Sequence, residues 1–185
     1  MNKTHTIVLG LLSLAFFGCK EDPIPKPRAM LRLEYPAQAY KMMESDCPYT
    51  FDYNQAAEVE FQGTCNLVLD YKPMKGSIFI TYKPVDGNIR ELLSDAQKLS
   101  YEHVVKADNI LEQPYMNADD RIYGMYYEVK GNAASQSQFY LTDSVNHFVT
   151  GSLYFYAKPN YDSILPAAIF MQRDIRRIME SLRWR

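Results

Sequence analysis

The sequence has few of the features that identify common classes of enzyme and binding protein. Lys and Arg number 20 against 22 Asp and Glu, and the pI is near 5.9, so no basic surface is expected for a nucleic-acid partner. The sequence contains no His-Glu-x-x-His, Gly-rich phosphate loop, EF-hand, Gly-x-Ser-x-Gly or cysteine pair at zinc spacing. It therefore predicts no metal, no cofactor and no enzyme class.

Glycine is scarce and aromatic residues are plentiful. The 185 residues include 8 Gly, 15 Tyr and 9 Phe. This composition favours strands with large cross-strand pairs over a helical bundle. The length suits one domain with a core rather than two. We expect a single α+β domain over residues 30–185.

Residues 1–18 have the pattern of a lipoprotein signal peptide. A short positive start precedes an apolar stretch over residues 7–17, which is too short for a stable transmembrane span. Residues 15–19, Ala-Phe-Phe-Gly-Cys, resemble a bacterial lipobox. That resemblance implies cleavage before Cys19 and attachment of fatty acyl chains such as palmitate, enough for stable anchoring. An ordinary signal peptide with an incidental cysteine is the alternative.

Residues 19–29 are predicted to be an extended tether, because prolines and charges there cannot bury a core. Lys rather than Asp at position 20 resembles the sorting pattern of lipoproteins sent to the outer membrane. Residues 20–22, Lys-Glu-Asp, also resemble a surface-export signal of some Bacteroidetes lipoproteins, although a solvated charge run explains them equally. We expect an outer-membrane anchor, with the membrane face left open.

Cys47 and Cys65 remain once Cys19 is lipidated, in a compartment that permits disulfides. A bridge between them would contribute about 3 kcal/mol in the chain-entropy model. The alternative is a pair of unpaired buried thiols.

Three predicted strands, 123–129, 137–142 and 147–157, form the centre of the domain. The last of these strands carries apolar or aromatic residues on both faces, so other elements must pack against both faces of the sheet. Shorter strands are predicted at 31–35, 47–53, 57–61, 65–71 and 77–82. The expected architecture is an antiparallel sheet covered by helices, similar to the PsbP-like α-β-α sandwich.

Two helices are predicted. Asn88 can cap the first, whose apolar spacing continues to Leu111 and includes His103, interpreted as a packed core histidine. Residues 113–121 then form a loop. Asp162 or Ser163 caps the second, with Pro166 in its first turn and Asp174 mostly on the polar side. Its expected buried stripe is Leu165, Ile169, Ile175, Ile178, Met179 and Leu182. Trp184 is expected to pack against the sheet.

Polar residues gather in the turns between the central strands: Ser135, Ser137, Asp143, Ser144 and His147. A catalytic triad needs a base beside its nucleophile and a third group to orient it. Asp143 and Ser144 are also ordinary turn residues, so a hydrolase using His147 with Ser144 or Ser135 is an alternative that no motif supports.

Several segments carry a family resemblance: residues 47–51 (Cys-Pro-Tyr-Thr-Phe), 98–103, 131–135, 151–155 and 159–163. They resemble the GldD family of gliding-motility lipoproteins of Bacteroidetes, and the resemblance spans nearly everything after Cys19. It implies a cell-envelope protein required for gliding and tied to type IX secretion, and it brings no catalytic residues. The residues most similar to the family lie in the turns, which predicts a partner surface at Asn132, Ser135, Asp143, Ser144 and His147.

Three hypotheses follow. The first is a lipid-anchored, non-enzymatic protein that stabilises or assembles the gliding and type IX secretion apparatus. The second is the small periplasmic hydrolase described above. The third is a carrier of a hydrophobic ligand held between sheet and helix, suggested by the aromatic content alone.

Overall fold

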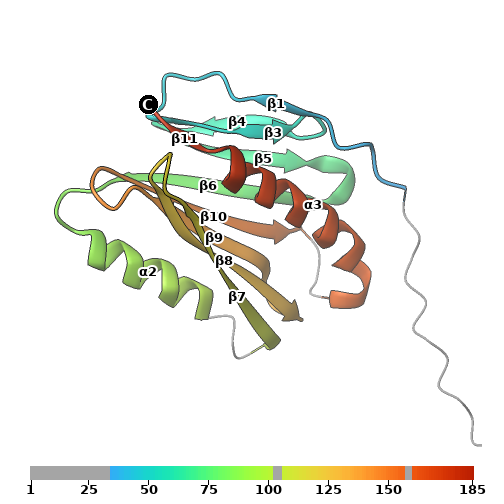
Figure 1. Ribbon diagram of the computed structural model, residues 1–185. Coiled ribbons are helices and arrows are strands. Elements are labelled where there is room, and N and C mark those ends of the chain that lie inside the picture. Colours follow the sequence, from blue (N-terminus) through green and yellow to red (C-terminus); the bar gives the residue numbers. More distant parts are fainter. Residues whose placement is uncertain (1–33, 102–105, 157–159) are drawn as a thin grey trace, which may run out of the picture.

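The domain is built on a seven-stranded antiparallel sheet with the strand order β4-β5-β6-β10-β9-β8-β7 (Figure 1). The computed structural model describes residues 34–101, 106–156 and 160–185. The strands are β4 (Glu58–Gln62), β5 (Asn66–Tyr71), β6 (Gly76–Pro84), β7 (Ala107–Asn117), β8 (Ile122–Gly131), β9 (Ser135–Thr142) and β10 (His147–Phe155). The predicted central strands are β8, β9 and β10, and the predictions at 57–61, 65–71 and 77–82 correspond to β4, β5 and β6.

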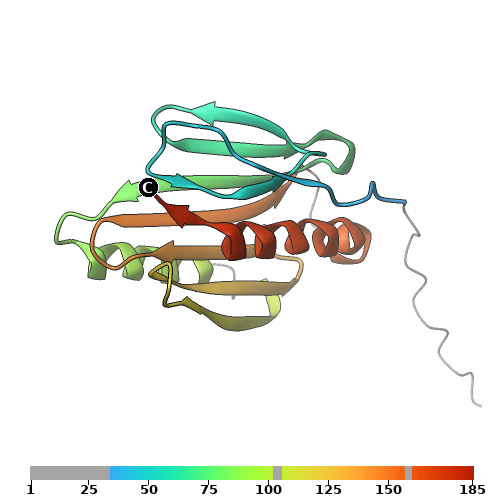
Figure 2. The same cartoon turned by 45° about the horizontal axis from the view of Figure 1, so that its top comes forward.

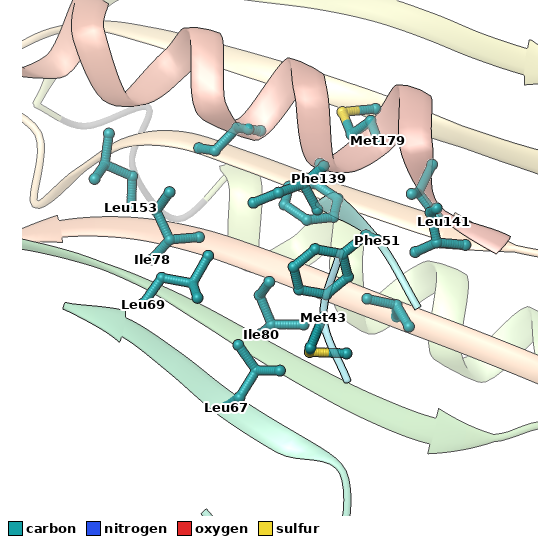
Figure 3. Close-up of a cluster of buried hydrophobic side chains, with 14 of the residues drawn as sticks. Met43, Phe51, Leu67, Leu69, Ile78, Ile80, Phe139, Leu141, Leu153 and Met179 are labelled. Carbon is teal, nitrogen blue, oxygen red and sulfur yellow. The ribbon is translucent and has the colours of Figure 1, made fainter. Parts of the chain in front are cut away.

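One helix lies on each face of the sheet. α3 (Tyr161–Ser181) runs along one face, with α2 (Ile89–Tyr101) behind the sheet (Figure 2). Under α3, apolar side chains of several strands, among them Leu69, Ile78, Leu153 and Phe139, meet apolar side chains of the helix such as Met179 (Figure 3). On the other face, the Ser100 hydroxyl of α2 donates to Oε1 of Gln138 in β9 at 2.8 Å. The predicted α+β class with an antiparallel sheet and two helices is confirmed.

Two small ribbons extend the cover beside α3. β1 (Tyr40–Met42) pairs with β3 (Asp52–Asn54), and β2 (Tyr49–Thr50) pairs with β11 (Arg183–Trp184). A short 3-10 helix, η1 (Lys72–Met74), joins β5 to β6. Cys47 and Cys65 are joined by a disulfide with Cα atoms 5.4 Å apart. The pairing of β2 with β11 therefore joins the start of the domain to its end.

The N-terminal segment packs on α3 instead of forming the predicted first strand. Residues 31–33 lie outside the described residues, and Glu34 and Tyr35 belong to no strand. The Tyr35 ring stacks on Phe170 of α3 with centroids 5.2 Å apart. We call residues 34–39 the strap. For Glu34 and Tyr35, side-chain packing on the helix replaces sheet pairing, and β1 is the first strand among the described residues.

The helix predicted to reach Leu111 is too long. α2 ends at Tyr101, and Ala107–Asn117 form β7, paired with β8 along its length. The loop predicted at 113–121 is therefore also wrong, because its first half belongs to that strand. The apolar spacing of this segment favours a helix, but pairing with β8 stabilises it as a strand. Pro114 is tolerated because β7 is an edge strand. His103 lies outside the described residues.

The second helix begins earlier than predicted and turns a different set of residues toward the core. It begins at Tyr161 with Asn160 at the N-cap, and Pro166 lies inside it. Ile169 is 39% exposed, and Phe170 and Met171 are buried in the core. Asp174, expected on the polar side, is 1% exposed. The helix therefore buries a carboxylate beside its apolar residues.

Candidate functional site

Asp174 is the acceptor at the centre of a polar cluster that joins four parts of the chain to α3. Its Oδ1 accepts from Gln38 Nε2 at 2.9 Å and from the Tyr40 hydroxyl at 2.7 Å. Its Oδ2 accepts from the Tyr71 hydroxyl at 2.9 Å. The Asn54 amide donates to both oxygens at 3.1 and 3.0 Å. Strap, β1, β3 and β5 therefore meet at one buried side chain.

The electrostatics of this cluster favour a structural role. Burial raises the pKa of Asp174, and the hydrogen bonds from Tyr40, Tyr71, Asn54 and Gln38 oppose that rise only in part. Hydrogen-bond donors on both oxygens offset the free-energy cost of burying this carboxylate. Its lone pairs are directed at the fold's own donors, so Asp174 positions the strap against α3. The sequence carried one signal for it, since Asp174 is four residues from both Phe170 and Ile178 on the buried stripe.

Asp143 holds the turn between β9 and β10. Its Oδ1 accepts the backbone N–H groups of Val145, Asn146 and His147 at 3.0, 2.8 and 2.8 Å. Burial raises the pKa of this carboxyl, but these three hydrogen bonds together bring it below its ordinary value. Ser144 sits in the left-handed region with φ 68°. A charged side chain thus fixes a tight turn whose tip, Val145, is 62% exposed.

His147 lies in a row of rings beside that turn. Its Nδ1 is 2.9 Å from the Tyr82 hydroxyl, and its ring stacks on Trp184 with centroids 5.2 Å apart. Tyr82 stacks in turn on Tyr49 at 5.7 Å. We call Tyr49, Tyr82, His147 and Trp184 the aromatic row. It packs the C-terminal β11 against the sheet, in agreement with the expected packing of Trp184.

The predicted partner residues divide between two ends of the sheet. Ser135 pairs with Tyr154, at the end of β9 opposite Thr142. It is fully buried, and its hydroxyl donates to the Ser137 carbonyl at 3.1 Å. Asn132 lies near that end and accepts the N–H of Tyr161 through Oδ1 at 2.9 Å, which places the start of α3. Of the five, Asp143, Ser144 and His147 lie together in one turn, where Asp143 is buried and Ser144 is exposed.

The same division argues against the hydrolase alternative, in which His147 acts with Ser144 or Ser135. Ser135 is one strand length away from His147, and within the part of the chain that the structure describes neither Ser135 nor Ser144 hydrogen-bonds to it. Ser144 contributes its backbone N–H to Thr142 Oγ1 at 2.9 Å. The Ser–His contact that nucleophilic catalysis uses is therefore not formed.

Comparison with known proteins gives the family. A family model described as gliding motility lipoprotein GldD matches residues 20–184. The chain belongs to the GldD family. Family membership confirms the resemblance seen in the sequence and gives the protein a role in gliding motility. As a lipoprotein family, GldD also implies attachment to the cell envelope through a lipid.

No curated protein and no solved structure matches the chain. The PsbP-like detail of this GldD fold therefore stays a prediction. Cys19, the expected lipid attachment site, lies outside the described residues. None of the helices in the described ranges is long and apolar enough to cross a membrane. In the same ranges, His, Cys, Asp and Glu side chains form no group of three that could hold a metal.

The hollows of this GldD domain lie mostly at its surface. Beneath α2 there is room for about 10 Å³ beside Ser100 and Gln138, and between α3 and β7 about 70 Å³. Ligand pockets for drug-sized molecules usually measure about 300–1,000 Å³. A larger apolar hollow of about 280 Å³ lies under the strap, between Tyr35, Phe155 and Ile164. Neither of the two smaller spaces is large enough for the ligand of the carrier hypothesis, and the hollow under the strap is just below that range.

Proposed function

We propose that this GldD-family protein is a lipid-anchored docking protein, without enzymatic activity, that stabilises or assembles the gliding and type IX secretion apparatus. Its anchor is Cys19 in the outer membrane. Its partner surface, which we call the docking turn, is residues 143–147. The remaining predicted partner residues, Asn132 and Ser135, serve the fold at the opposite end.

The observation that carries the proposal is the engagement of His147 by Tyr82 and Trp184. His147 is the base on which the hydrolase alternative depends, and its ring and Nδ1 are used to pack the C-terminus. The two most constrained carboxylates, Asp174 and Asp143, likewise accept hydrogen bonds from the protein's own groups. Asp143 and His147, which invited a catalytic interpretation, therefore hold the docking turn and the C-terminus in place, and Asp174 holds the strap.

The docking turn has the properties of a preformed contact. Three backbone hydrogen bonds to Asp143 fix its shape, and the apolar Val145 is presented at its tip. A rigid loop loses little conformational entropy when a partner binds. A small apolar tip such as Val145 contributes contact area that excludes water around the stronger anchors of an interface.

The position of the docking turn also suits an anchored protein. The strap begins at Glu34, beside Ser163 and Ile164 at the N-terminal end of α3. The aromatic row and the C-terminus lie at the other end of that helix (Figures 1 and 2). A helix of 21 residues is about 31 Å long at 1.5 Å per residue. The strap, which follows the tether in sequence, therefore lies at one end of the domain and the docking turn lies at the other.

Gene deletion with complementation tests the proposal. Deletion should abolish colony spreading and adhesin export, and the natural gene should restore both. Val145→Asp should restore neither, while Val145→Ala, with a smaller apolar tip, should retain most function at equal protein levels. Normal spreading and export in the deletion strain would refute the function. Full complementation by Val145→Asp would refute the docking turn.

A further inference from the structure

β4 is an open edge of the sheet. Among the described residues no strand pairs with its outer side, so alternate residues direct N–H and C=O groups outward. The other edge, β7, carries Pro114 and an irregularity between Ala107 and Asn109, both of which hinder pairing. β4 pairs regularly with β5 from Glu58 to Gln62 and contains no proline. Of the two edges, β4 is the better template for an added strand.

An apolar hollow lies directly beside this edge. It measures about 350 Å³ and lies between β4 and the β1–β3 ribbon. Met42 is 58% exposed and Phe61 is 46% exposed, which is unusual for such large apolar side chains. We call this the β4 hollow; its lining is Lys41, Met42, Met43, Glu44, Tyr53, Val59 and Phe61. Because methionine side chains are flexible, such a surface can adapt to partners of different shape.

The opposite face of β4 is acidic. Val59 and Phe61 line the hollow, so the alternating Glu58 and Glu60 point to the other face of the sheet, where both are exposed. Glu58 pairs with Lys72, whereas Glu60 forms no ion pair with any described residue. These charges disfavour indiscriminate edge pairing and favour a strand that brings basic side chains.

We propose that β4 and the β4 hollow bind an extended segment of a partner protein in which apolar residues alternate with basic ones. The segment adds a strand to the sheet. Its apolar residues enter the β4 hollow and its basic residues face Glu58 and Glu60. The identity of the partner as an apparatus component rests on the proposed function, but the binding chemistry does not.

The disulfide connects the two walls of the β4 hollow. Cys47 closely follows Glu44 on one wall, and Cys65 lies just beyond the strand that carries Phe61 on the other. The Tyr49 hydroxyl donates to the Cys65 carbonyl at 2.7 Å, so the bridge also adjoins the aromatic row. The hollow is thus a fixed surface in the oxidised protein, continuous with the end of the domain that bears the docking turn.

Peptide binding tests this surface. The full mature chain, in lipid nanodiscs, is titrated with the fluorescent peptide Lys-Val-Lys-Leu-Lys-Val-Lys. We expect saturable binding with hydrogen-exchange protection of residues 58–62, and much weaker binding of the same peptide with Glu in place of Lys or with its residues in scrambled order. Phe61→Asp and Glu60→Lys should each weaken binding roughly tenfold or more. Leu111→Asp and Glu112→Lys, the matched changes on the other edge, should leave it unchanged.

Several results would overturn the proposal. Absence of binding, equal binding of the scrambled peptide, or protection of β7 instead of β4 would each do so. Dimerisation that protects β4 without peptide would assign the edge to a second copy. Protection of β4 that is lost when residues 20–33 are replaced by a Gly-Ser tether would assign it to the protein's own N-terminal segment. Loss of spreading on deletion together with no peptide binding would leave the proposed function standing and reject this surface alone.

Discussion

The Tyr71 hydroxyl of β5 donates to Oδ2 of Asp174 in α3 at 2.9 Å, across 103 positions of sequence. This contact joins the sheet to the helix at the point where Gln38 of the strap and Tyr40 of β1 also bind. The carboxylate therefore links the strap and β1 to the core.

Asp174→Ala should destabilise the domain by about 3 kcal/mol or more, because buried donors lose their acceptor. Glu180→Ala on the exposed side of the same helix should change stability by less than about 0.5 kcal/mol. Urea denaturation of both variants measures the difference. Equal stability of the two variants would show that the cluster does not hold the fold.

Asp174 also predicts a pH dependence. Burial raises the pKa of this carboxyl in the folded protein, above the unfolded value of about 3.9. The folded state then holds the proton more tightly than the unfolded chain. The stability contributed by this titration is fully present below about pH 4 and is lost as the pH rises through the folded pKa.

The Asp174→Asn variant cannot titrate at this position and isolates that effect. The unfolding free energy of the natural protein minus that of the variant should fall as the pH rises from about 4 to 7. Urea denaturation at a series of pH values measures it. A difference that grows with pH would mean that the folded pKa is lowered instead.

Thiol labelling tests the bridge between Cys47 and Cys65. Alkylation without reductant should leave both thiols unlabelled in the intact mass, and labelling of both would contradict the bridge. Replacing both cysteines by serine should lower stability by about 3 kcal/mol, since the bridged residues are 18 positions apart. It should also weaken peptide binding at the β4 hollow more than Leu111→Asp does.

His147→Phe separates docking from catalysis. The phenyl ring keeps the stack on Trp184 but has no basic nitrogen, and it loses only the contact with the Tyr82 hydroxyl. We expect a loss of about 1 kcal/mol in stability and full complementation of spreading in a deletion strain. Because His147 also ends the docking turn, partner crosslinking from position 145 is measured in the same variant. A folded, normally abundant variant that fails to complement but still crosslinks to the apparatus would revive the hydrolase.

The sequence predicted the central strands because their pattern is local. In β9 and β10, apolar and aromatic residues alternate between short polar turns, and both faces of β10 are covered as its composition requires. The amphipathic α3 was also recognisable from its spacing. In these elements the local residue pattern and the packing in the folded domain indicate the same structure.

The errors have a different physical origin. β7 carries apolar residues at a helix-like spacing, and only its partner β8 reveals a strand. Asp174 was placed in solvent because its four donors come from distant segments. The placement of the predicted site residues also depends on strand pairing. Ser135 and His147 are 12 positions apart in sequence, and the antiparallel pairing of β9 with β10 carries them to opposite ends of the sheet.

The most direct test of the docking account is photo-crosslinking in the living envelope. A photoreactive residue replaces Val145 at the docking turn or, as a control, Asp95 on the exposed side of α2, and the tagged protein is purified under denaturing conditions. The account predicts crosslinks from position 145, but not from position 95, to components of the gliding and type IX secretion apparatus. Identical products from both positions, or none at position 145 in cells that still spread, would contradict it.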